Sequence, residues 1–326
     1  MSGRFAPPAH PVRRLPAQDP RGGGAVRRWT PPWPVDLGLV LGVLRRGPAD
    51  PTYRTASDGA VWRTARTPAG PGTLCVRSGG AGDVVAEAWG DGAEWLLDAL
   101  PGLLGAADEP DAFTPRHRLV AYSRHRRPGL RLTRTGLVME SLIPSVLEQK
   151  VTTDEAYRAW RLLVRKYGEP APGPAAGAGM YVLPETRAWA LVPSWEWHRA
   201  GVDDKRAATI VRAARVARRL EEAVAMEPEA AMARLELVPG VGPWTSAETV
   251  QRSHGAPDAL TLGDLHLPRI VGYALAGDRD ADDAAMLELL APYAGQRHRA
   301  ARYVLLGGRI PPRRKPKMPK VDIGLL

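Results

Sequence analysis

The sequence predicts an α+β protein in which a small N-terminal α+β domain, built on an antiparallel sheet, precedes a larger all-α domain. Three observations support this prediction. Segments of alternating polarity, "AVWRTART" and "GTLCVRS", lie between residues 29 and about 110. From about residue 115 the strand signals stop, and apolar residues recur every three or four positions. The 326 residues are enough for two or three domains and a substantial core.

The first part of the chain divides into a basic segment and the α+β domain. Residues 1–28 carry six arginines and one acid among many prolines and glycines, so we expect a disordered basic segment. The α+β domain is predicted over residues 29–114. It contains an apolar helix over residues 35–46, the alternating strands and a second helix in "GDGAEWLLDALPGLL".

The all-α domain is predicted over residues 115–306. Helical spacing is clear in "ESLIPSVLEQKVTTDEAYRAWRLLVRKYG" and in "DDKRAATIVRAARVARRLEEAV", which opens with acids as helix N-termini do. A Gly/Pro/Ala loop, "PAPGPAAGAG", divides the domain. Residues 307–326 are basic and rich in proline, so we expect an extended tail.

Composition narrows the function classes. Lys plus Arg number 45 against 35 for Asp plus Glu, and this formal charge of +10 favours an anionic partner. Most of the basic residues are arginines in a chain rich in Ala, Gly and Pro, a bias that a GC-rich genome also produces, so charge is supporting evidence only. With Cys75 as its one cysteine, the chain alone cannot build a disulfide, a thiolate zinc site or an iron–sulfur cluster. The apolar run at 37–44 is too short to span a membrane, so we expect a cytoplasmic protein without a membrane partner.

One stretch, "LVPGVGPWTSAETV" at residues 237–250, places two glycines between two helical patterns. Backbone N–H groups at such a hairpin and at the following helix N-terminus can grip a phosphate without a side-chain charge. An ordinary turn between two helices fits the same pattern. The later segment "TLGDLHLP" isolates a single acid, Asp264.

Together these two segments resemble the signature of the helix-hairpin-helix (HhH-GPD) superfamily of DNA glycosylases, and within it the bacterial 3-methyladenine DNA glycosylase II family. The resemblance extends to "LIPSVLEQKVT" and "GQRHRAARYVLLG" and covers roughly residues 29–307. It implies a double-stranded DNA partner that contains a damaged base, and a location on the nucleoid. We expect the chain to act as a monomer.

The resemblance also implies the roles of particular residues. Asp264 falls on the catalytic aspartate, and Trp244 falls where alkylpurine enzymes stack an aromatic ring on the base. The residues implied in DNA contact are Gly240, Val241, Gly242, Thr245, Gln149 and Lys150. The last two align with the element that fills the gap left by a flipped base, where an apolar wedge is common, so Lys150 is a departure. Backbone carbonyls of Glu236, Val238 and Val241 match those that hold a structural Na⁺ or K⁺, and no other cofactor is implied.

The chemistry explains these residue types. Breaking an N-glycosidic bond leaves positive charge on the deoxyribose, which a fixed carboxylate stabilises while it orients or deprotonates water. Alkylated purines are cationic and leave readily, and an electron-rich ring holds them by stacking and cation–π attraction. Glycosylases that also cut the strand carry a lysine where this chain has Trp244. Without that amine there is no Schiff base to the sugar, so a monofunctional hydrolase is implied.

Each assignment has an alternative. Asp264 precedes a helix expected to begin at Leu265 and could serve only as its N-cap, and Trp244 could be a core residue. Asp258 fits a structural turn, and Gln296 stands where alkylpurine enzymes place an aromatic. Three functions therefore remain open: an alkylpurine glycosylase, a same-fold glycosylase for oxidised or deaminated purines, and a non-catalytic DNA-binding protein. Asp264 in its motif argues against the third.

Overall fold

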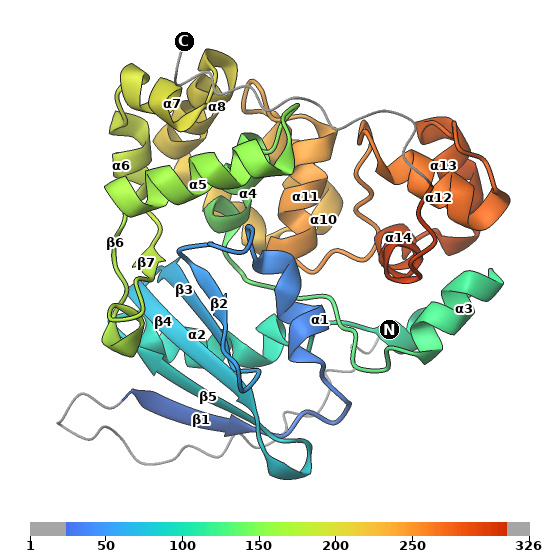
Figure 1. The fold of residues 1–326 in the computed structure, drawn as a ribbon, viewed down its shortest axis with the longest axis horizontal. Coiled ribbons are helices and arrows are strands. Elements are labelled where there is room, and N and C mark those ends of the chain that lie inside the picture. The colour runs from blue at the N-terminus through green and yellow to red at the C-terminus, as the bar shows by residue number, and fades with distance from the viewer. Residues whose placement is uncertain (1–23, 312–326) are drawn as a thin grey trace, which may run out of the picture.

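The computed structural model describes residues 24–311, and Figure 1 shows a twisted sheet with two groups of helices beside it. The sheet is antiparallel, with strand order β1-β5-β4-β3-β2. Its strands are β1 (Ala25–Trp29), β2 (Tyr53–Thr55), β3 (Val61–Thr67), β4 (Gly70–Ser78) and β5 (Val84–Trp89). The two alternating segments become β3 and β4, which confirms the predicted α+β class and its antiparallel sheet.

Strand β1 corrects the predicted boundary of the basic segment, because residues 25–28 are ordered in it. The strand alternates in burial, with Arg27 and Trp29 buried and their neighbours more exposed. A buried guanidinium needs a partner, and Nη1 of Arg27 lies 2.6 Å from Oδ1 of Asp98. The arginine-rich composition concealed this alternation. Residues 1–23 of the predicted segment lie outside the described residues.

Two helices complete the N-terminal domain. Helix α1 (Leu37–Leu41) continues as the 3₁₀ turn η1 (Gly42–Leu44), and the carboxylate of Asp36 accepts a hydrogen bond from the Leu39 amide at its start. Helix α2 (Ala93–Leu103) packs on β4, β5 and β1. Two further 3₁₀ turns are η2 (Gly80–Gly82) and η3 (Pro110–Ala112). Both predicted helices are therefore confirmed, the first being shorter than expected.

The all-α half contains two hydrophobic cores. The first is formed by α4 (Val138–Leu147), α5 (Thr153–Tyr167), α6 (Thr186–Leu191), α7 (Ser194–Ala200), α8 (Asp204–Arg215), α9 (Ala217–Glu221), η5 (Glu222–Ala225), α10 (Pro228–Glu236) and α11 (Pro243–Ser253). The second is formed by α3 (Arg118–His125), α12 (Leu267–Ala276), α13 (Asp283–Leu290), η6 (Ala291–Tyr293) and α14 (Arg297–Leu306). The chain crosses from one core to the other between α11 and α12, so the segment that carries Asp264 bridges them.

The Gly/Pro/Ala loop is packed against the sheet domain. It contains the 3₁₀ turn η4 (Gly173–Ala175) and lies between β6 (Glu169–Pro170) and β7 (Tyr181–Val182), which pair with each other. The Tyr181 amide donates to the Pro51 carbonyl over 2.8 Å. A short strand pair thus interrupts the otherwise helical half, and its strand β7 contacts β3 and β4 of the main sheet.

The helical spacing over residues 140–168 forms two helices, α4 and α5, with a break between them. Thr152 and Glu155 form a capping box that starts α5. Lys150 lies in the break with φ of 54°, the only positive φ at a non-glycine residue in the described part of the chain. Within residues 24–311, no helix is long and apolar enough to cross a bilayer.

Candidate active site

The hairpin between α10 and α11 is held against helix α8. Gly240 has φ of +99°, and a Cβ at this position would lie 2.0 Å from Oγ1 of Thr209, so only glycine fits. The Pro239 carbonyl accepts a hydrogen bond from Nη1 of Arg212 over 3.1 Å. Gly242 is extended and precedes Pro243, the first residue of α11, as is common at helix starts. The structure confirms two helices joined by a hairpin.

The hairpin amides are not equivalent. The Val241 amide donates to the Val238 carbonyl over 2.9 Å, and Val241 is buried, so this predicted phosphate donor is used inside the turn. Gly240 is exposed and Gly242 half-buried, which leaves these two as the hairpin's candidate donors. The proposed cation ligands are carbonyl oxygens, as a hard cation requires, and one lone pair of the Val238 carbonyl is already engaged. The cation itself stays a prediction. Within residues 24–311, no cluster of three His, Cys, Asp or Glu side chains suits a metal ion.

Gln149 and Thr245 support the hairpin from inside the protein. Nε2 of Gln149 donates to the Gly240 carbonyl (3.0 Å) and to Oγ1 of Thr245 (2.7 Å). Thr245 is 2% exposed, so its side chain does not reach DNA, in contrast to the prediction. Its hydroxyl is bonded to Gln149, which is distant in the sequence, so sequence spacing could not reveal this contact. Lys150, the next residue, is exposed and lies beside this bonded pair. The left-handed backbone at Lys150 is the kind of strain that functional sites often hold.

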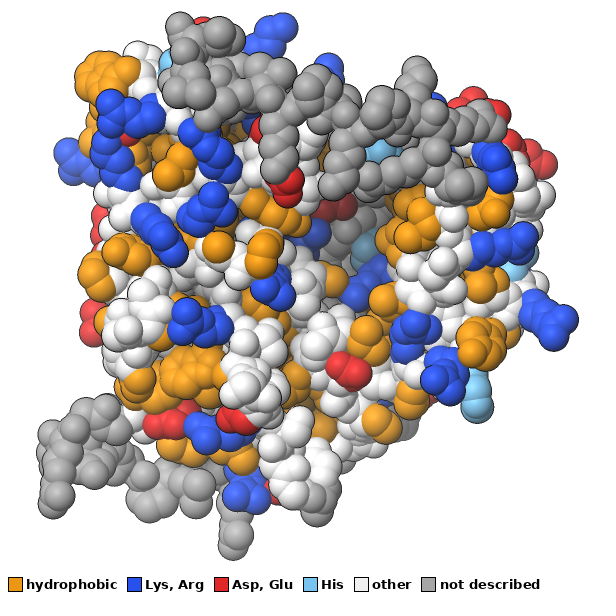
Figure 2. Space-filling view, in the orientation of Figure 1, with side chains coloured by type: hydrophobic (Ala, Val, Ile, Leu, Met, Phe, Trp, Pro, Cys, Tyr) orange, Lys and Arg blue, Asp and Glu red, His pale blue; other side chains and the backbone are white. Residues whose placement is uncertain are grey.

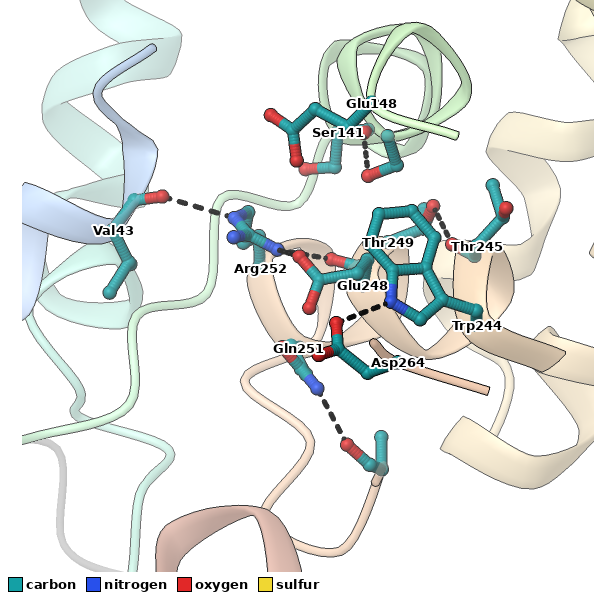
Figure 3. Close-up of polar contacts among 12 residues, drawn as sticks. Val43, Ser141, Glu148, Trp244, Thr245, Glu248, Thr249, Gln251, Arg252 and Asp264 are labelled. Carbon is teal, nitrogen blue, oxygen red and sulfur yellow. Dashed lines mark hydrogen bonds and ion pairs between the residues drawn. The ribbon is translucent and has the colours of Figure 1, made fainter. Parts of the chain in front are cut away.

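Trp244 and Asp264 form a hydrogen-bonded pair across the two helical cores. Nε1 of Trp244 donates to Oδ2 of Asp264 over 2.9 Å, as Figure 3 shows. The other carboxylate oxygen accepts from the amides of His266 and Leu267, each at 2.8 Å. Helix α12 starts at Leu267, two residues later than expected, because Asp264 bonds amides further along the chain. Both carboxylate oxygens are thus oriented by donors.

Asp264 therefore accepts hydrogen bonds from two amides at the start of α12 and also from the indole of Trp244, so the two kinds of contact coexist. Trp244 is half-buried and is not a simple core residue. A carboxylate held by fixed donors keeps its position while charge develops beside it, which is the arrangement that favours electrostatic stabilisation.

Besides Trp244, helix α11 carries two residues of the candidate site that were not predicted from the sequence, Glu248 and Arg252. Glu248 and Arg252 follow Trp244 at intervals of four on α11, so the three share one helix face. Nη1 of Arg252 lies 2.6 Å from Oε2 of Glu248, and its Nε donates to the Val43 carbonyl over 3.0 Å. The signal was present as the spacing Trp-x₃-Glu-x₃-Arg within the glycine hairpin motif.

Helix α14 supplies further polar groups near Arg252. Burial, and then the guanidinium groups of Arg302, Arg252 and Arg299, hold the pKa of His298 well below its usual value, so its imidazole is neutral at physiological pH. Arg302 donates to the Leu39 carbonyl over 3.0 Å, and burial is the main cause that lowers its pKa to about 10. Figure 2 shows a hollow between the two helical cores with charged and histidine side chains inside it.

Two further polar side chains, those of Asp258 and Gln296, have structural roles. Asp258 accepts from the Arg297 amide and guanidinium, which fixes the start of α14 and confirms its structural role. Oε1 of Gln296 accepts from Nε of Arg299 over 2.7 Å. The Gln296 side chain is therefore bonded within its own helix, and it does not supply the aromatic ring that alkylpurine enzymes place at this position of the pocket.

Trp244→Phe tests the bond to Asp264 while it keeps an aromatic ring. Given the glycosylase activity that the sequence resemblance implies, we expect the rate of base release to fall about tenfold, since a hydrogen bond to a charged group typically contributes ~1.5–3 kcal/mol. Single-turnover excision from a damaged duplex measures the rate. Trp195→Phe, at an indole that is 66% exposed, is the matched control and should match the wild type. Equal rates for Trp244→Phe and wild type would contradict a role for this bond.

Comparison with known proteins tests the fold. No protein-family model and no curated protein sequence matches the chain. Among solved structures, a 3-methyladenine DNA glycosylase from Archaeoglobus fulgidus matches with a TM-score of 0.67 at 19% identity, over 86% of this chain and 96% of the other. The chain has the helix-hairpin-helix DNA glycosylase fold.

An 8-oxoguanine glycosylase/lyase from Clostridium acetobutylicum matches equally well. In its apo form the TM-score is 0.68 at 13% identity, over 87% of this chain and 96% of that one. The same enzyme in complex with double-stranded DNA that contains cytosine opposite 8-oxoguanine matches with a TM-score of 0.67 at 12% identity, over 91% of this chain and 99% of that one. The glycosylase fold is therefore shared with enzymes named for an alkylated and for an oxidised base.

Proposed function

We propose that the chain is a monofunctional DNA glycosylase that extrudes a damaged, alkylated purine from duplex DNA and hydrolyses its N-glycosidic bond. The observation that carries the proposal is the Trp244–Asp264 pair, which lies directly after the glycine hairpin and joins the two helical cores. The pair therefore places an aromatic ring directly beside an oriented carboxylate.

The reaction follows from these groups. The amides of Gly240 and Gly242 bind a phosphate of the damaged strand and so hold the sugar near Asp264. As the C1′–N bond breaks, the base leaves with the electron pair and the sugar becomes positively charged. The Asp264 carboxylate stabilises that charge and accepts a proton from water, whose oxygen bonds C1′. Trp244 stacks on the extruded base, and its cation–π attraction favours a cationic alkylated purine.

The absence of an amine at position 244 supports simple hydrolysis. A lyase needs an amine that attacks the sugar to form a Schiff base. Three lysines lie in the described part of the chain: Lys150, Lys166 and Lys205. Lys166 lies 2.6 Å from Glu196 in an ion pair, and the indole of Trp244 occupies the place beside Asp264.

The experiment uses duplexes that each contain one lesion, either 7-methylguanine, hypoxanthine or 8-oxoguanine, together with an undamaged control. We expect base release, with strand breaks that appear only after alkali and no adduct trapped by borohydride. Release of 8-oxoguanine in preference to 7-methylguanine would favour the oxidised-base alternative. Failure to release any base would leave only a DNA-binding role, and a trapped adduct would point to Lys150 or Lys205 as the attacking amine.

A further inference from the structure

The α11 face beyond Trp244 carries an acid that the proposed mechanism does not use. We propose that Glu248 reads the edge of the extruded base and selects guanine-type purines over adenine-type purines. This inference rests on the proposed function, since it concerns the same pocket. Figure 3 shows Glu248 beside the Trp244 ring and on the same side as Asp264, between these residues and Arg252.

The Glu248 carboxylate is held in one orientation. Its Oε2 pairs with Nη1 of Arg252 over 2.6 Å, and the same nitrogen donates to the Glu248 backbone carbonyl over 2.7 Å. The Val43 carbonyl fixes the other side of the guanidinium. The Glu248 and Arg252 side chains are only 15% and 14% exposed, so they hold this arrangement largely out of water.

Arg252 remains charged and acts as the positioning residue. Burial opposes protonation of its guanidinium, but the carboxylates of Glu248 and Glu148 outweigh that effect and raise the pKa of Arg252. With Oε2 committed to Arg252, the other oxygen, Oε1, hydrogen-bonds no side chain or amide in the part of the chain that the structure describes. An oriented acceptor thus lies next to the ring on which the base would stack.

The hydrogen-bonding groups of the two purines explain why Glu248 would prefer guanine-type bases. A carboxylate only accepts hydrogen bonds. The pairing edge of guanine offers two adjacent donors, N1–H and the 2-amino group, and either can donate to Oε1. The pairing edge of adenine offers a donor next to the acceptor N1, which the carboxylate would repel. 7-Methylguanine keeps the guanine edge and carries the positive charge that Trp244 favours, whereas 3-methyladenine lacks this edge.

Glu248→Gln reverses the hydrogen-bonding pattern at nearly constant shape. The amide oxygen would face Nη1 of Arg252, because that nitrogen requires an acceptor, so the NH₂ group would face the base. A donor would then oppose the donors of guanine, while it could donate to the acceptor N1 of adenine. The ion pair is lost, but the hydrogen bond to Arg252 is kept.

The test uses DNA methylated with dimethyl sulfate, which contains 7-methylguanine and 3-methyladenine in the same molecules. Both released bases are measured by chromatography, so a change in DNA affinity cancels in their ratio. We expect Glu248→Gln to lower the ratio of 7-methylguanine to 3-methyladenine at least tenfold. Glu87→Gln, which breaks an exposed 3.1 Å ion pair with Arg77 in the sheet, is the control and should leave the ratio unchanged.

A ratio that stays at the wild-type value in Glu248→Gln, whether or not both rates fall, would overturn the inference and leave Glu248 as a structural partner of Arg252. If that variant fails to fold, Glu248→Asp serves instead. It keeps the charge for Arg252 but withdraws the carboxylate, and the ratio should again fall. A wild-type protein that releases neither base contradicts the proposed function itself, which is a different outcome from an unchanged ratio.

Discussion

Asp264→Asn is expected to slow single-turnover base release by about a hundredfold to a thousandfold, because a preorganised charge in a desolvated site typically contributes ~3–4 kcal/mol. Binding of the damaged duplex should persist, since the hairpin that we propose binds the phosphate is unchanged. The decrease should be smaller for cationic 7-methylguanine than for neutral hypoxanthine. The bond to a cationic base is already weak, so less stabilisation is needed.

The stability of this variant follows from the hydrogen bonds of Asp264. The asparagine oxygen can still accept from the amides of His266 and Leu267, and Asn caps helices about as well as Asp. Its NH₂ group would then face Nε1–H of Trp244, so one hydrogen bond is lost at a cost of about 1 kcal/mol. We expect the melting temperature to fall by about 2–4 °C.

Asp282→Asn is the matched control for capping. Asp282 is exposed, and its carboxylate accepts from the Ala285 amide over 3.0 Å at the start of α13. This variant should lose a similar or smaller amount of stability and keep wild-type activity. If Asp264→Asn and Asp282→Asn both release bases at the wild-type rate, Asp264 is only a helix cap.

Gly240→Val is expected to weaken binding to undamaged duplex by about a hundredfold, since hydrogen bonds to a charged phosphate contribute ~1.5–3 kcal/mol each and the hairpin offers two amides. The valine Cβ would collide with Oγ1 of Thr209, and the left-handed backbone at Gly240 disfavours any branched residue. The hairpin must therefore shift and misdirect both amides. Fluorescence anisotropy at two salt concentrations measures the loss, because phosphate contacts are strongly salt-dependent.

Gly59→Val separates backbone strain from loss of the hairpin. Gly59 has φ of +84° in the turn between β2 and β3, and a Cβ there meets nothing within 4 Å. This variant should lose stability through strain and still bind duplex as the wild type does. Wild-type affinity in Gly240→Val would contradict phosphate binding by the hairpin amides.

Periodicity and turn chemistry predicted the elements of the fold well. The alternating segments became β3 and β4, and the glycine hairpin separates α10 from α11 as expected. Strand β1 was missed because its arginines resemble a disordered segment until the Asp98 partner of Arg27 is known. The division of the helical half into two cores was also missed, since helical spacing shows that a face is apolar but not which helix covers it.

At the site, local motifs carried only part of the information. Asp264 and Trp244 could be chosen from their motif, but the hydrogen bond between them joins residues on separate cores. The burial of Thr245 and the internal use of the Val241 amide depend on packing against Gln149 and on the turn conformation. Glu248 and Arg252 were missed because an acid and a base four residues apart on a helix most often form an exposed ion pair.

The most direct test of the central claim is the detection of free base by mass spectrometry. Wild-type protein and Asp264→Asn would be incubated in excess with one duplex that contains 7-methylguanine and with the same duplex undamaged. The proposed function predicts release of 7-methylguanine from the damaged duplex by the wild type, with a rate about a hundredfold lower in Asp264→Asn. Equal release by the two proteins at equal DNA occupancy would contradict the account.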